Sequence, residues 1–466
     1  MNVAVDAERA RAGSAFEALI AWAAAQQNRP LPEDVRRRAA LILADDIGAM
    51  VAAAVEPEVA KTRAGFARSS DTAEASVFAP ATPRLDRYAA AAANGMAAAW
   101  CELDEGFRAA PCHAGAYALP ALLAEAEYRG LSVAEVLAAL ALAYEITTRC
   151  AQAFPFAVMN VHPHAAFATL GAAAGAALAR KAPAPVLMAA VSGAASMSFA
   201  GPFGHATEGA LVRNAWTSAG AWIGLRSADW AEAGIAGLPT TVYDVFVGAF
   251  RTGCVADALT EALGERWAVA GGYHKIFACC QYAHSAVEAT LDLHGRLTQT
   301  GRKVDELSEI VVETHPRGLN LTTVEPATVL AAKFSMPHAA AATAALGTGG
   351  QRAFTNETLS DPQIAALRRK VRLAPHPAIG EWPNDRPARV SWRFADGETW
   401  SASCASARGG ADQPFDETTM LEKLRENSRH AFPRMADALE AIVRGEEAAL
   451  ARSWRETVAT MMQGAE

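Results

Sequence analysis

The sequence predicts a mainly α protein, in which a large all-helical domain is interrupted by a smaller α+β domain that forms a lid. Three observations support this prediction. The chain has 466 residues, 52% of them hydrophobic, which is more than a single core usually holds. Alanine-rich segments with apolar residues at helical spacing fill the first part of the chain and return near its end. Between them lie β-branched runs separated by turn signals.

Helical spacing of apolar residues predicts the elements of the first part. We expect helices at residues 16–25, 35–53, 85–100, 117–127, 133–154 and 165–179. Ser132, with Glu135 three residues on, forms a capping box for one of them. Pro32, Glu33 and Asp34 place a proline and two acids in the first turn of another, where the helix dipole favours negative charge.

The α+β part begins after a helix that starts at His284. Strands are expected at residues 309–314, 370–373, 389–394 and 399–404, with helices at 337–346 and 361–369 between them. Asp396-Gly397 between the last two strands predicts a hairpin. Helices then return at 417–427 and 435–461. We therefore expect a helical domain of residues 1–268 and 409–466, a lid of residues 269–408, and a ligand site in the crevice between them.

Composition excludes several classes of protein. A net charge of -8 argues against a nucleic-acid-binding surface, and it requires a local cluster of cations to attract any anionic substrate. Seven cysteines without framework spacing indicate reduced thiols and a cytoplasmic protein. The apolar stretches are short or rich in small residues, and the first 15 residues lack the pattern of a secretory signal. We therefore expect neither a membrane span nor a membrane partner.

Acidic and imidazole side chains gather in a turn-rich gap between two apolar helices. The gap holds Glu102, Asp104 and Glu105, followed by Arg108 and His113. A polar loop with a helix-capping acid is the alternative interpretation. His113 lies close to a glycine just before a buried helix, which favours a functional site, since loops held by rigid helices often carry function.

Two further positions have open interpretations. His162-Pro163-His164 precedes the helix at 165–179, and His162 either caps this helix or serves in proton transfer or substrate binding. Metal binding is disfavoured because no carboxylate or cysteine stands at a matching spacing. Arg213 has apolar neighbours, so its guanidinium either pairs with an internal carboxylate or binds a substrate carboxylate.

Residues 273–284 carry the densest set of groups that donate, accept or hold protons. They are Tyr273, His274, Lys275, Cys279, Cys280, Tyr282 and His284. The adjacent cysteines face different directions on any regular element, which favours packing over joint metal ligation. The remaining groups suit a site that moves protons on a small anionic substrate.

Taken in order along nearly the whole chain, these motifs resemble the MmgE/PrpD family. Residues 43–48, Asn94-Gly95 and residues 333–337 add to the match. The family includes 2-methylcitrate dehydratase, cis-aconitate decarboxylase and iminodisuccinate epimerase. The resemblance implies a helical domain built from both chain ends, a smaller lid, a homodimer, and a site in the cleft between the domains. It also implies cofactor-free chemistry at a carbon next to a carboxylate.

The motifs and the resemblance together indicate the site residues. The expected catalytic residues are His113, His162, His284, Asp104 and Lys275, and the expected substrate-binding residues are Arg213, Glu102, Glu105, Tyr273 and His274. Neither a metal nor a cofactor is expected, and the partner is a small carboxylate. Arg213 and Lys275 would stabilise developing negative charge, and the histidines would serve as base and acid in an order that stays open.

The function that follows is a hydro-lyase that dehydrates a small hydroxylated di- or tricarboxylate. An epimerase of a small dicarboxylate such as iminodisuccinate is one alternative, and an inactive carboxylate-binding homologue is another. Ala114 stands where the family usually has proline, and Glu105 stands where a second aspartate is common. A tyrosine of the decarboxylase branch is also missing near residues 320–323, which argues against decarboxylation of cis-aconitate.

Overall fold

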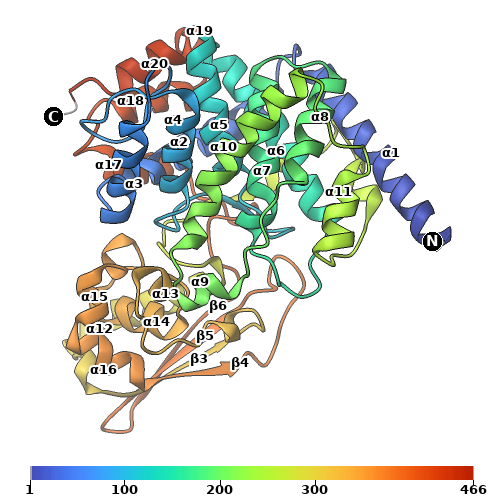
Figure 1. Ribbon diagram of the computed structural model, residues 1–466. Coiled ribbons are helices and arrows are strands. Elements are labelled where there is room, and N and C mark those ends of the chain that lie inside the picture. The colour runs from blue at the N-terminus through green and yellow to red at the C-terminus, as the bar shows by residue number, and fades with distance from the viewer. Residues whose placement is uncertain (1–2, 465–466) are drawn as a thin grey trace.

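The computed structural model describes residues 3–464 and is mainly α with a smaller α+β region, which confirms the predicted fold class. In Figure 1 the helical region forms the upper body and the α+β region lies below it. Among the described residues, no helix is long and apolar enough to cross a membrane.

The first part of the helical region is built around one helix that is buried over its whole length. The elements are α1 (Val3–Gln26), α2 (Glu33–Ala52), α3 (Pro57–Arg68), α4 (Arg87–Ala98), α5 (Ala114–Arg129), α6 (Val133–Ala153), α7 (Pro163–Ala179), α8 (Ala184–Ala195), α9 (Gly204–Glu208), α10 (Val212–Glu232) and α11 (Thr241–Tyr243). Every residue of α7 is buried, and α5, α6, α8 and α10 pack around it. Its alanines and glycines allow this close packing.

The local start signals act as predicted. Ser132 and Glu135 form both hydrogen bonds of the capping box before α6, and α2 begins at Glu33 directly after Pro32. Helix α1, however, starts at Val3 and not near residue 16. Its first turns lack an apolar stripe, but Arg9 forms an ion pair of 2.6 Å with Asp244, which holds this end against the body.

The chain returns to the helical region through its C-terminal helices. These are α17 (Glu417–Ser428), α18 (Met435–Arg444), α19 (Glu447–Ala451) and α20 (Trp454–Met461). Helices α17 and α18 pack on α2, and α20 packs on α5, so both ends of the chain share one body (Figure 1). The single helix expected at 435–461 is wrong, because Gly445 ends α18 in the left-handed conformation and Ser453 caps α20 as a new helix.

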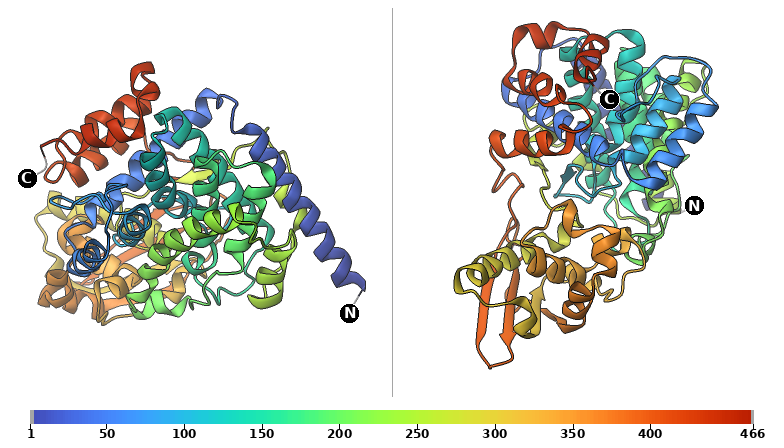
Figure 2. Two further views of the ribbon diagram at one scale, coloured as in Figure 1. Left: turned by 45° about the horizontal axis from the view of Figure 1, so that its top comes forward. Right: turned by 90° about the vertical axis from the view of Figure 1, so that its left-hand side faces the viewer.

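The α+β region is a four-stranded mixed sheet with helices on one face. Its elements are α12 (His284–Thr300), β3 (Leu307–Thr314), α13 (Val329–Lys333), α14 (Met336–Leu346), α15 (Asn356–Ser360), α16 (Pro362–Lys370), β4 (Val371–Pro375), β5 (Ala388–Phe394) and β6 (Thr399–Cys404). The strand order is β4-β3-β5-β6, with only β3 and β4 parallel. Burial alternates along β5, so one face packs on α12 and the other is exposed, as Figure 2 shows.

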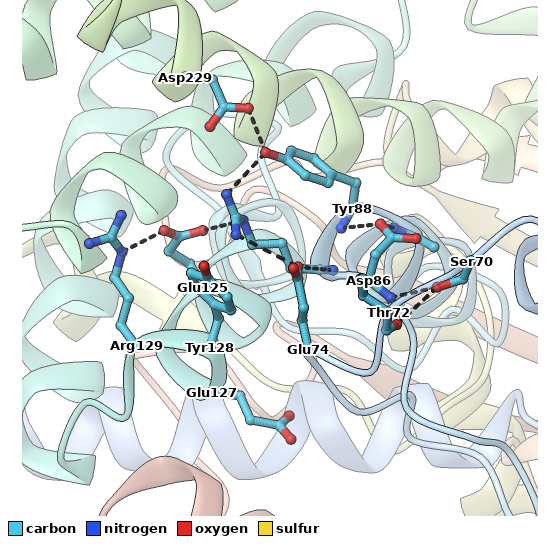
Figure 3. A network of polar contacts seen from close by, with 12 residues as sticks. Ser70, Thr72, Glu74, Asp86, Tyr88, Glu125, Glu127, Tyr128, Arg129 and Asp229 are labelled. Carbon is cyan, nitrogen blue, oxygen red and sulfur yellow. Dashed lines mark hydrogen bonds and ion pairs between the residues drawn. The ribbon is translucent and has the colours of Figure 1, made fainter.

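A buried carboxylate ties several helices together far from the α+β region. Glu125 on α5 is fully buried, and its carboxylate lies 2.6 Å from Arg129, as Figure 3 shows. Its oxygens also lie 3.0 Å from Arg180 and 3.2 Å from Arg87. Arg180 continues to Asp229 on α10 at 2.9 Å. Because a buried charge is costly unless it is paired, this network fixes how α4, α5 and α10 pack.

Candidate active site

Two segments that the sequence singled out are joined by a two-residue antiparallel pairing. Strand β1 (Gly106–Phe107) follows the acidic loop and pairs with β2 (Gly272–Tyr273), so that Gly106 lies opposite Tyr273. A Cβ atom at Gly106 would lie only 2.5 Å from the Tyr273 ring. Glycine at this position therefore allows the acidic loop to contact the segment that carries Lys275.

This pairing leaves a small cavity, here called the inner cavity, with a volume of about 60 Å³. Six of the expected residues line it: Glu102, His113, His162, Arg213, Tyr273 and Lys275. They come from the acidic loop, the starts of α5, α7 and α10, and the segment after β2. Asp104, Glu105, His274 and His284 lie behind this first layer and do not line the cavity.

Arg213 is paired with an internal carboxylate. It forms an ion pair with Glu102 and donates from Nη1 to the Ala99 carbonyl at 2.9 Å. Glu102 has a φ of +54°, in the left-handed region that a non-glycine residue rarely adopts. Strain of this kind persists where the surrounding contacts hold it, and it is commonest at functional sites.

Lys275 lies between two carboxylates. Its Nζ is 3.5 Å from Glu102 Oε2 and 3.2 Å from Asp104 Oδ1. Although burial favours the neutral amine, the charges of Asp104 and Glu102 raise the pKa of Lys275 above its ordinary value. Burial opposes ionisation of Asp104 as well, but Lys275 and His113 lower the pKa of Asp104. Lys275 is therefore an ammonium ion and suits charge stabilisation, not proton abstraction.

His113 has a fixed tautomer. Its Nδ1 lies 2.8 Å from Asp104 Oδ2 and 2.8 Å from the Glu105 carbonyl oxygen. Nδ1 donates its proton to the Glu105 carbonyl, and the charge of Asp104 lies beside this N–H without a hydrogen bond. In the neutral ring Nε2 then keeps its lone pair. Since His113 lines the inner cavity, this arrangement of carboxylate and imidazole suits a general base.

His162 faces a hydrogen-bond donor at each ring nitrogen. It caps α7, and its Nδ1 accepts a hydrogen bond of 3.1 Å from the backbone N–H of His164. Its Nε2 lies 3.4 Å from Nε of Arg213, an N–H that donates toward it. Burial, helped by Arg213, lowers the pKa of His162 well below its ordinary value. His162 is thus a helix cap and also an uncharged imidazole that holds Arg213 at the cavity.

Glu105 points away from the cavity and supports the acidic loop. Its side chain accepts from the Gly115 N–H at 2.6 Å and from the Tyr144 hydroxyl at 2.9 Å. A Cβ at Gly115 would lie 2.4 Å from Asp46 Oδ2 and 2.9 Å from Glu105 Oε1, so the two carboxyl groups lie close together. Burial raises the pKa of Glu105 to about 8, and burial together with Glu105 raises the pKa of Asp46. One of the two groups therefore holds a proton at neutral pH.

Two histidines of the opening segment also lie behind the cavity wall. His274 Nδ1 is 2.8 Å from Asp45 Oδ2, and the same carboxylate pairs with Lys423 of α17. His284 Nε2 lies 3.1 Å from the Cys279 carbonyl, and burial with the nearby charge of Lys275 lowers its pKa to about 3. The structure therefore places both histidines as supports of the wall, with no contact to the cavity.

Several further residues line the inner cavity, and one of them, Arg386, carried no signal of function in the sequence. The additional lining residues are Phe107, Pro111, Cys112, Met159, Pro163, Phe203, Cys280, Gln281, Tyr282, Phe334 and Arg386. Arg386 lies in the connection before β5, where no spacing or repeat marks it. Cys279 and Cys280 are free and buried, and burial raises the pKa of Cys280 to about 11, so these thiols are protonated.

The side chains of the inner cavity are suited to acid–base chemistry on an anion. The imidazole of His113 is set as a base, an uncharged second imidazole lies at the same cavity, and two cations lie beside them. Within residues 3–464, no group of three or more His, Cys, Asp or Glu side chains could hold a metal ion.

Two family models together match most of the chain. The MmgE/PrpD N-terminal domain matches residues 17–259, and the MmgE/PrpD C-terminal domain matches residues 277–446. Among curated proteins, none matches the chain significantly. The two matches follow each other in the order expected for one complete pair of domains, and they confirm the resemblance seen in the motifs. The chain therefore belongs to the MmgE/PrpD family, whose members are generally lyases of the dehydratase type.

Proposed function

We propose that this protein is a cofactor-independent hydro-lyase that dehydrates a small hydroxylated di- or tricarboxylate. The observation that carries the proposal is the Asp104–His113 pair, in which Nδ1 donates to the Glu105 carbonyl beside the charge of Asp104 and Nε2 is left as a base at the inner cavity. Family membership supports a lyase in general terms. The homodimer implied by the resemblance and the cytoplasmic location indicated by the cysteines belong to the same proposal.

The proposed reaction starts at the carbon next to a carboxylate. His113 Nε2 takes the proton of this carbon, and its electron pair moves into the carboxylate to form an enediolate. The ammonium of Lys275 and the guanidinium of Arg213 lie where this negative charge develops. Asp104 stabilises the imidazolium that His113 becomes.

Loss of water completes the reaction. The electron pair of the enediolate forms the carbon–carbon double bond as the β-hydroxyl leaves. The uncharged imidazole of His162 and the Arg213 guanidinium that it holds lie beside the leaving oxygen. The proton that converts the hydroxyl to water comes from the imidazolium of His113, which restores the base for the next turnover.

A panel of hydroxylated di- and tricarboxylates tests the proposal. The expected result is an alkene conjugated with a carboxylate, followed by its ultraviolet absorbance, and loss of this signal by orders of magnitude in H113A. Running the same panel in deuterated solvent separates the alternatives. Exchange of the α-proton without alkene would indicate an epimerase. If no acid of the panel shows either proton exchange or alkene formation, the result contradicts an enzyme of this type.

A further inference from the structure

A second, larger cavity adjoins the inner cavity at the junction of the helical and α+β regions. This outer cavity has a volume of about 720 Å³, and Phe107, Pro111 and Arg386 line both cavities. Sites for small molecules usually measure roughly 300–1,000 Å³. The inner cavity, at about 60 Å³, is far below this range. A polycarboxylate whose reacting end lies beside His113 must therefore extend past Arg386 into the outer cavity.

Positive charge predominates in the outer cavity, although the whole chain carries a net charge of -8. Three arginines line it, namely Arg108, Arg317 and Arg386, against Asp385 as the one carboxylate among its lining residues. Asp385 is shared, since it lies 2.5 Å from Arg108 and 3.3 Å from Arg386. Such a local excess of cations attracts anions that the rest of the surface would repel.

Arg386 differs from the other cations of the site in having spare binding capacity. Its Nη1 donates to Gln281 Oε1, its guanidinium lies 5.1 Å from the centre of the Tyr282 ring, and its side chain is only 9% exposed. No described residue provides a partner for its Nη2. Its Nε lies 3.3 Å from the partly exposed Asp385, whereas Arg213 and Lys275 are each paired with buried carboxylates. A held guanidinium with an unused N–H edge is suited to bind a carboxylate.

We propose that Arg386 binds a second carboxylate of the substrate at the neck between the two cavities. The protein would then select acids with at least two carboxylates, one near Arg213 and Lys275 and one on Arg386. That the reacting end of the ligand lies beside His113 rests on the proposed function. Binding of a carboxylate by Arg386 does not require turnover and can be measured separately.

Calorimetric titration with unreactive acids at fixed ionic strength tests this assignment. The probes are propionate with one carboxylate, succinate with two and tricarballylate with three. In R386M the affinity for succinate and tricarballylate should fall by about 10- to 100-fold, as expected for a lost charged hydrogen-bonded contact, while the affinity for propionate should stay within about twofold. The matched control is R369M, because Arg369 is an exposed arginine of α16 that lines neither cavity. Its selectivity should equal that of the wild type.

Three results would overturn the assignment. Equal selectivity in R386M and the wild type would exclude Arg386 as the second anchor. Equal weakening of all three acids would show that Arg386 maintains the site as a whole, and failure of the wild type to prefer the di- and tricarboxylate would exclude a second anchor. Thermal unfolding of all variants checks that they fold. If R386M does not fold, the same titration with R386Q decides the result. Absence of turnover with Arg386-dependent binding intact would contradict the lyase and leave this proposal standing.

Discussion

The substitution D104N tests the central contact of the candidate site. Asp104 is fully buried, and its Oδ2 lies 2.8 Å from His113 Nδ1. Asparagine keeps the size of the side chain but removes the charge that faces the imidazole. Lys275 retains Glu102 as a partner at 3.5 Å, so the variant leaves that ammonium paired.

The expected magnitude follows from the charge that His113 gains when it takes a proton. At a separation of about 4 Å and an effective dielectric constant of about 20, two unit charges attract by about 4 kcal/mol. Since each 1.4 kcal/mol corresponds to about tenfold in rate, loss of this attraction in the transition state predicts a fall in kcat of about 1,000-fold. KM should change little, because the charge on the imidazole is absent in the ground state.

The assay is the rate of alkene formation at saturating substrate, with circular dichroism to check the fold. The chain contains a matched control in the Asp45–His274 pair, which has the same 2.8 Å contact to Nδ1 but does not line the inner cavity. D45N should therefore lower thermal stability and leave kcat within about tenfold. The reasoning is refuted if D104N keeps kcat within tenfold of the wild type, or if D45N loses as much activity as D104N.

Two further predictions concern the support of the acidic loop. The carboxyl of Glu105 has an ordinary pKa of 4.5 and a pKa of about 8 in the fold, so between these values the unfolded state binds fewer protons and stability falls as pH rises. E105Q should flatten this decline in the melting temperature between pH 5 and 8. An unchanged slope would contradict the claim that the Glu105 and Asp46 carboxyl groups together hold a proton. G106A should separate β1 from β2, because its Cβ would lie 2.5 Å from the Tyr273 ring, and it should cost about 1–3 kcal/mol of stability with loss of turnover. G295A, which places a Cβ in open space on α12, is its control in chemical denaturation, and equal effects of the two would contradict the close packing at Gly106.

Local signals explain why most of the fold could be predicted. The capping box at Ser132 and the turn at Asp396-Gly397 act within a few residues, and both appear where the sequence places them. The break of the helix after Arg444 was missed because the apolar spacing continues across it, and only the backbone at Gly445 ends the helix.

The candidate site depends on contacts that no local pattern encodes. The sequence could not decide between the two roles of Arg213, because its partner Glu102 lies in a loop far along the chain. Glu105 and His284 were singled out by their chemistry, but the structure directs both away from the cavity. No sequence motif identifies Arg386 as a site residue, because its position at the cavity depends on how the α+β region packs against the acidic loop.

The contact of Lys423 with Asp45 has a consequence for the order of assembly. Lys423 of α17 also donates to the Leu103 carbonyl at 2.7 Å, so it holds the acidic loop from behind. Its partner Asp45 lies 378 positions earlier in the chain. At a synthesis rate of about 5–20 residues per second, roughly 20–75 seconds separate these two residues on the ribosome. In a nascent chain every residue of the inner cavity is therefore synthesised before the lysine that holds the acidic loop from behind.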